Sequence, residues 1–181
     1  MVNEIKNHNS TIGIDASARS TGVVILNSSP RPLKVLIKPK KLSGANRLQY
    51  IYDTLCGLLT IYSPTLAVME GASYYSTNKP FILGEVYGIC KLALLQHNVP
   101  LVLVAPRALK KYASGHGNAR KEKMLSEANK LGCKTDSHDI ADAWFASKLA
   151  QDILLGTVSI KTRAAAEVVH HLTKELHANQ C

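Results

Sequence analysis

Four acidic residues stand where a fold could bring their carboxylates together. Asp15 ends one short apolar run of the chain, and Glu70 ends another. Asp139 and Asp142 are three residues apart in a segment of helical periodicity, so both lie on one face of that helix. Oxygen ligands without a pattern of histidine or cysteine are the donors that Mg²⁺ and Mn²⁺ prefer. The four acids therefore predict a divalent-metal site.

Each of these acids also has an ordinary structural explanation. Asp15 could form a turn, Asp139 could complement a helix dipole, and Asp142 could be a solvated charge. Their joint placement favours the functional interpretation, because clustered carboxylates repel one another and need a compensating cation. Two neighbouring residues are interpreted differently: Asp136 as a helix cap and His138 as a loop histidine rather than a ligand.

Apolar periodicity predicts an α/β domain that would position these acids. We expect strands at 11–15, 23–26, 33–38, 66–69 and 101–104. We expect helices at about 43–62, 80–98, 119–131, 137–154 and 162–177. A further helical stretch is expected between Pro106 and a Gly115-His-Gly117 loop. Three adjacent strands with short links predict an antiparallel meander. Strands separated by helices then complete a mixed five-stranded sheet with helices on both faces. If the first and fourth strands are neighbours, Asp15 and Glu70 converge at one edge of this sheet.

Length, charge and composition narrow the class of protein. The 181 residues suit one domain, and the net charge of +9 excludes an ordinary acidic enzyme and suggests a polyanionic partner. We expect no membrane segment, because no apolar stretch approaches the roughly 20 residues of a spanning helix. Widely spaced cysteines predict free thiols in a reducing cytoplasm. We expect a flexible arm at 1–10, one domain at 11–155 and a helical extension at 156–181 that covers the core, contacts DNA or braces a dimer.

Five ordered motifs resemble those of a known family. The chain resembles the RuvC family of Holliday junction resolvases in Gly13-Ile-Asp15, Ser20-Thr-Gly22, Val-Met-Glu70, Ala105-Pro-Arg107 and Asp139-Ile-Ala-Asp142-Ala, over about residues 11–152. The resemblance implies an RNase H-like nuclease fold and a homodimer that nicks four-way DNA junctions symmetrically. It also implies hydrolysis with two Mg²⁺ ions, for which Mn²⁺ substitutes, leaving 5′-phosphate and 3′-hydroxyl ends. The compact loops are more similar to phage-type members than to cellular ones.

The resemblance also assigns roles to single residues. It makes Asp15, Glu70, Asp139 and Asp142 the metal ligands, with Lys121 stabilising the transition state. Basic residues that flank the glycine loop are predicted to contact DNA; these are Arg107, Lys110, Lys111, Arg120, Lys121 and Lys123. Tyr74 and Tyr75 are predicted to stack on junction bases, and the segment 84–88 to form the dimer contact. The chain departs from the family pattern after the first motif, where Ala16-Ser17 replaces the usual Pro-Gly.

Other functions remain open at this point. The same acids would serve a nuclease of this fold that cuts RNA or an RNA–DNA hybrid. A junction-binding dimer without catalysis would keep the basic surface and lose the metal site. An actin-like or sugar-kinase-like ATPase shares the first hairpin, but it needs two such domains and the chain holds one, so we expect no nucleotide cofactor.

Overall fold

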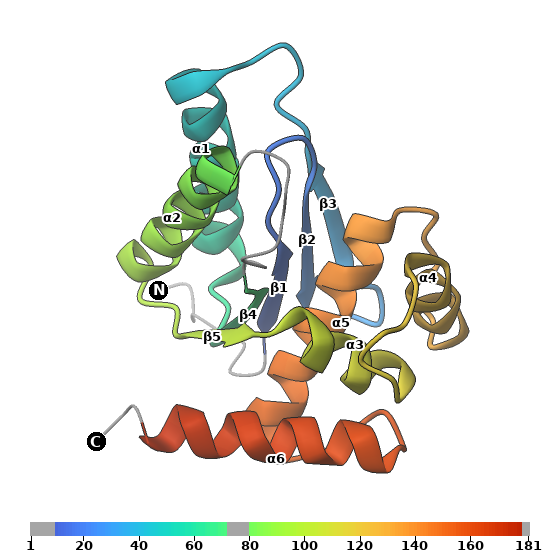
Figure 1. Cartoon of the computed structure of the whole chain (residues 1–181). Helices are drawn as coiled ribbons and strands as arrows, with labels where there is room; N and C mark the ends of the chain where they lie inside the picture. The colour runs from blue at the N-terminus through green and yellow to red at the C-terminus, as the bar shows by residue number, and fades with distance from the viewer. Residues whose placement is uncertain (1–9, 72–79, 179–181) are drawn as a thin grey trace.

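The computed structural model describes residues 10–71 and 80–178 and contains a mixed five-stranded sheet. Its strands are β1 (Thr11–Asp15), β2 (Thr21–Leu26), β3 (Leu33–Ile37), β4 (Leu66–Glu70) and β5 (Leu101–Val104). Their order across the sheet is β3-β2-β1-β4-β5 (Figure 1). The pairs β1–β2 and β2–β3 are antiparallel, whereas β1–β4 and β4–β5 are parallel. The two strands that end in an acid, β1 and β4, are therefore direct neighbours.

Helices cover both faces of the sheet. The helices of the described residues are α1 (Gly44–Tyr62), α2 (Pro80–Gln96), α3 (Pro106–Ser114), α4 (Lys121–Lys130), α5 (His138–Leu155) and α6 (Arg163–Ala178). Figure 1 shows α1 and α2 together on one side, α5 on the other with α3 and α4 beside it, and α6 across one end. No helix in this described part is long and apolar enough to cross a membrane.

The alternation of side chains along the strands separates two cores. Ile12 and Ile14 of β1 belong to the core under α1 and α2. Thr11 faces the opposite side, where its hydroxyl lies 3.1 Å from the backbone oxygen of Ser147 on α5. Because successive strand residues point to opposite faces, Asp15 is on the α5 face as well. Leu66 and Val68 of β4 pack in the α5 core. Glu70 is the next residue of this alternating set, so it is on the α5 face too.

The predicted fold class and element order are confirmed, and two local predictions at the start of α5 are wrong. The predicted strands and helices all form, with boundaries shifted by at most a few residues. The N-cap of α5 is Ser137, whose hydroxyl accepts a hydrogen bond from the amide of Ile140 at 3.3 Å. Asp136 is exposed one residue earlier, so its carboxylate is not the cap. His138, expected in a loop, is instead the first residue of α5. The cysteines Cys90 and Cys133 are buried free thiols, as expected.

The segment after residue 155 is joined to the core by a buried carboxylate. Asp152 on α5 is 1% exposed and accepts hydrogen bonds from Tyr112 Oη of α3 at 2.8 Å, from Thr157 Oγ1 at 3.0 Å and from Ser159 Oγ at 3.0 Å. Helix α6 then buries Ala165, Val168, Val169 and Leu172. These residues pack in the same core as α3 and α5. The final helix thus covers the core, which was one of its three expected roles.

Candidate active site

Two neighbouring parallel strands each end in a carboxylate. The register of β1 and β4 pairs Ile14 with Met69, so the next step places Asp15 beside Glu70. Both residues share the face that α5 covers, and both are partly buried. The parallel crossover from β1 to β4 brings the carboxyl ends of the two strands to one edge. The convergence expected from the sequence is therefore present.

Two glycines let α5 bring the other two acids to this edge. Gly22 pairs with Asp15 across the β1–β2 hairpin, and a Cβ placed on Gly22 would lie 2.3 Å from the backbone oxygen of Asp139. A Cβ on Gly13 would lie 2.0 Å from the backbone oxygen of Ala143. Since real Cβ atoms do not approach backbone so closely, only glycine allows α5 to sit directly on β1 and β2. The backbone at Asp139 is thereby placed against the strand position opposite Asp15.

Burial and mutual repulsion raise the pKa values of three of the acids. Burial raises the pKa of Asp15 well above its usual range, and the negative charges of Asp142, Glu70 and Asp139 raise it further. Burial, followed by the charge of Asp142, raises the pKa of Glu70 to about 7. Burial is also the main cause that raises the pKa of Asp142. Coupled carboxylates of this kind are typical of a site built to receive positive charge.

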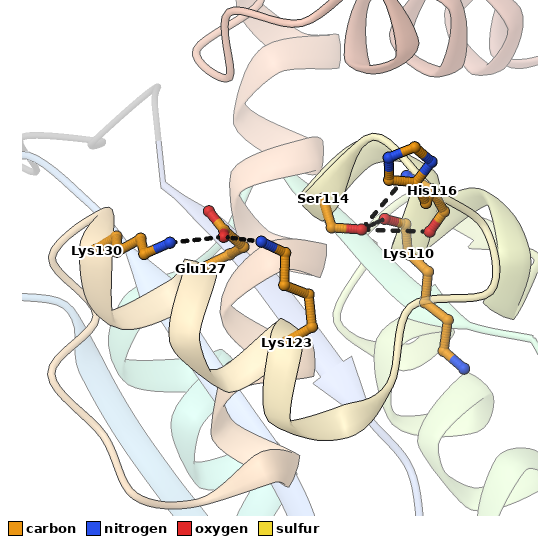
Figure 2. A network of polar contacts seen from close by, with 6 residues as sticks. All are labelled: Lys110, Ser114, His116, Lys123, Glu127 and Lys130. Atoms are coloured by element: carbon orange, nitrogen blue, oxygen red, sulfur yellow. Dashed lines mark hydrogen bonds and ion pairs between the residues drawn. The ribbon is translucent and has the colours of Figure 1, made fainter.

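Two lysines from separate helices offset part of this repulsion. The ammonium groups of Lys110 on α3 and Lys121 at the start of α4 both lower the pKa values of Glu70 and Asp142. The turn between the helices is organised by Ser114, whose hydroxyl donates to the backbone oxygen of Lys110 at 2.9 Å (Figure 2). Gly115 follows in a left-handed conformation with φ of 83°. Lys110 and Lys121 therefore act electrostatically on Glu70 and Asp142, and their roles toward a phosphate stay predictions.

The other predicted DNA-contacting residues have different surroundings. Lys111 forms an ion pair of 2.7 Å with Glu167 on α6. Figure 2 shows Glu127 between the ammonium groups of Lys123, at 2.7 Å, and Lys130, at 3.0 Å. Arg107 and Arg120 are exposed. Tyr74 and Tyr75 lie outside the described residues.

The donor chemistry of the site fits a hard divalent cation. The four carboxylates offer oxygen ligands only, and the raised pKa values of Asp15, Glu70 and Asp142 would fall on binding a cation. Within residues 10–71 and 80–178, no three acidic, histidine or cysteine side chains are already arranged to enclose an ion. His138, at the start of α5, leaves its Nδ1 buried without a partner among the described residues.

A tyrosine that the sequence did not single out reaches the same edge. Tyr87 on α2 donates a hydrogen bond of 2.6 Å from its hydroxyl to the backbone oxygen of Glu70. Seventeen residues separate the two, and nothing in the local sequence pattern indicates the contact. Tyr87 is a residue of α2, so the helix on the opposite face of the sheet also contributes to the site.

The raised pKa of Glu70 predicts how stability depends on pH without metal. Its pKa is about 7 in the folded chain and about 4.5 when unfolded, so the folded state holds a proton that the unfolded state releases in this window. Stability should therefore fall as the pH rises from about 4.5 to about 7, by roughly 3 kcal/mol at 1.36 kcal/mol per pKa unit.

Urea unfolding between pH 4.5 and 8 in a chelator measures this dependence. Glu70→Gln should weaken it, leaving the part that Asp15 and Asp142 contribute, and Mg²⁺ should raise stability more at pH 8 than at pH 5. An equal pH profile for the wild type and Glu70→Gln would contradict the assignment of Glu70 to the buried cluster.

This combination of fold and site defines a class of protein. A sheet in the order β3-β2-β1-β4-β5, with carboxylates on its two central parallel strands and on the helix across them, is the arrangement that the resemblance to RNase H-like nucleases predicts. The family model described as crossover junction endodeoxyribonuclease RuvC matches residues 11–150.

Named relatives agree with that match. The chain is 32% identical to the RuvC of Dictyoglomus thermophilum in an alignment of 141 residues that covers 73% of this chain and 89% of that protein. It is 32% identical to the RuvC of Thermosipho melanesiensis over 146 residues, or 74% of this chain and 93% of that one. The structure of Thermus thermophilus RuvC in complex with Holliday junction substrate has the same fold, with a TM-score of 0.70, 23% identity, and coverage of 83% of this chain and 98% of that one. The chain belongs to the RuvC family, which consists of metal-dependent nucleases.

Proposed function

We propose that the protein resolves four-way DNA junctions by hydrolysing a phosphodiester bond in each of two opposed strands. The observation that carries this proposal is the cluster of four carboxylates flanked by Lys110 and Lys121, in a chain that matches the RuvC model from residue 11 to 150. The net charge of +9 supports a polyanionic substrate, and the mixed sheet supplies a rigid frame for the site.

The chain's own groups divide the chemical work. Asp15, Glu70, Asp139 and Asp142 would hold Mg²⁺, with two ions per site and Mn²⁺ as a substitute. When bound, the ions supply Lewis acidity to the phosphate and lower the pKa of water. Lys121 places a positive charge beside the acids, where it stabilises the negative charge that develops on the phosphate. Lys110 adds a second positive charge from α3.

A panel of labelled nucleic acids tests the substrate. We expect the wild-type protein in Mg²⁺ to make paired, symmetric nicks in a mobile four-way DNA junction, with 5′-phosphate and 3′-hydroxyl ends mapped on all four strands. Forks, flaps, an RNA–DNA hybrid and structured RNA form the rest of the panel. Faster cleavage of the hybrid or the RNA would favour another RNase H-like activity. Junction binding without cleavage in Mg²⁺ or Mn²⁺ would overturn the catalytic proposal.

We further propose that two copies associate through the outer face of α2. Phe81 is 87% exposed and Leu95 73% exposed on this helix, and Leu92 is 43% exposed between them. A Cβ on Gly84 or Gly88 would meet nothing within 4 Å in the chain. Glycines inside a helix cost about 0.5–1 kcal/mol each, so their openness here favours the close approach of a second helix. An exposed apolar face of this kind is typical of an interface.

Charge on that face should separate the copies. Leu95→Glu is expected to weaken the dimer by about tenfold or more, because it would bury an unpaired carboxylate. Sedimentation measures the dissociation, and strand mapping shows whether nicks lose their pairing. Leu131→Glu, which changes a leucine 45% exposed after α4, is the matched control. Equal association in the two variants would refute the α2 interface.

We also propose that the protein works in a reducing cytoplasm. Burial raises the pKa of the Cys90 thiol to about 12 and that of Cys133 to about 11. Both groups therefore stay protonated and unreactive, as suits core positions rather than disulfide partners.

A further inference from the structure

We infer that Tyr87 is a positioning residue that orients Glu70 through the main chain, an inference that rests on the proposed function of the acidic site. Its hydroxyl donates to the backbone oxygen of Glu70 at 2.6 Å. The ring lies on α2, on the opposite face of the sheet from α5, which carries the other two acids. Tyr87 touches no carboxylate directly in this contact, so its effect must pass through the peptide group.

The peptide group between Glu70 and Gly71 is held from both sides. Its carbonyl accepts the hydrogen bond from Tyr87, and its N–H donates to the backbone oxygen of Val104 on β5 at 2.8 Å. Two hydrogen bonds on opposite edges fix the plane of that peptide, and with it the ψ angle of Glu70. Because β4 ends at Glu70, this anchoring occurs where the regular ladder stops. The side chain of Glu70 thus leaves the sheet in a direction that Tyr87 helps to set.

The Tyr87 hydroxyl is an ordinary hydrogen-bond donor, and burial raises its pKa. Losing a hydrogen bond of this kind, with its partner left unsatisfied, is expected to change a rate or an equilibrium constant about fivefold to tenfold.

The contact also links two functions of one helix. The outward side of α2 exposes Leu92 and Leu95, which form the proposed dimer face. Its inward side carries Val86 and Cys90 into the core and Tyr87 to the main chain of Glu70. The position of α2 and the orientation of Glu70 are therefore coupled through one side chain.

Tyr87→Phe tests the inference, because it removes the hydroxyl and keeps the ring. We expect kcat for junction cleavage to fall about fivefold to tenfold and the Mg²⁺ concentration for half-maximal rate to rise several-fold. Affinity for the junction without divalent metal should stay within about twofold, since the lost hydroxyl bonds to the backbone oxygen of Glu70 and not to a phosphate-binding side chain. The affinity for Mn²⁺ alone, measured by calorimetry on the DNA-free protein, should fall in the same proportion as the Mg²⁺ requirement rises.

Tyr52→Phe is the matched control. Tyr52 on α1 donates its hydroxyl to Gln96 on α2, so the variant loses the same atom from a contact of α2 that does not involve Glu70. This variant should lose stability alone and keep the wild-type Mn²⁺ affinity. If Tyr87→Phe behaves as Tyr52→Phe does in both kcat and Mn²⁺ affinity, the inference is wrong. If the wild type cuts no junction, the proposed function fails, and the Mn²⁺ affinities still decide the role of Tyr87.

Discussion

Asp15→Asn is expected to abolish junction cleavage while junction binding persists. Asp15 lies at the centre of the cluster, where Glu70, Asp139 and Asp142 all act on it electrostatically. The amide keeps the shape of the side chain and removes the charge that would hold a cation. Because metal chemistry supplies most of the catalysis in such a site, the rate should fall on the order of a thousandfold.

The same substitution should make the metal-free protein more stable. Burial and three like charges raise the pKa of Asp15 in the folded state, so its ionised form opposes folding above the usual pKa of aspartate. An amide carries no such charge. Thermal unfolding in a chelator at pH 8 should therefore show a higher midpoint for Asp15→Asn than for the wild type. The loss of activity and the gain of stability together are the signature of a site that is strained without its cation.

Asp136→Asn provides the control for both measurements. It makes the same chemical change at an exposed acid just before α5, outside the cluster. Cleavage, junction affinity and stability should all remain close to those of the wild type. Cleavage by Asp15→Asn within tenfold of the wild-type rate would show that the reaction does not depend on the acidic cluster.

The sequence is most informative where a local pattern carries the structural reason. Apolar runs that end in an acid locate Asp15 and Glu70 correctly, because alternation along a strand fixes which face each carboxylate shares. Helical spacing likewise places Asp139 and Asp142 on one face. The same pattern does not fix the first residue of a helix. The sequence therefore predicts Asp136 as the cap of α5, whereas the neighbouring Ser137 is the cap.

Contacts between distant segments could not be predicted in this way. The DNA contact of Lys111 stays a prediction, and its ion pair with Glu167 spans 56 residues and depends on how α6 packs. The hydrogen bond of Tyr87 to Glu70 likewise depends on the placement of α2. Lys123 is different: Glu127 stands four residues later, a spacing at which helical ion pairs form, and that signal was available in the sequence.

The second large expected effect is a loss of stability on substitution of Gly22 in the first hairpin, with a glycine of α1 as the control. Gly22→Ala should lower the free energy of unfolding by about 3 kcal/mol or more, because its Cβ would lie 2.3 Å from the backbone oxygen of Asp139. Backbone cannot rotate out of the way as a side chain does, so α5 must move off the sheet. Gly57→Ala on α1 should instead stabilise the protein by about 0.5–1 kcal/mol, since a Cβ there meets nothing within 4 Å.

Urea midpoints of the two variants should therefore shift in opposite directions. Where Gly22→Ala remains folded at low temperature, cleavage should fall about a hundredfold, because a displacement of about 1 Å at Asp139 disturbs the alignment of the acids. Gly57→Ala should cleave at the wild-type rate. If Gly22→Ala kept both wild-type stability and wild-type cleavage, α5 would not be seated on β2 at Asp139, and the convergence of Asp139 and Asp142 on Asp15 would need another explanation.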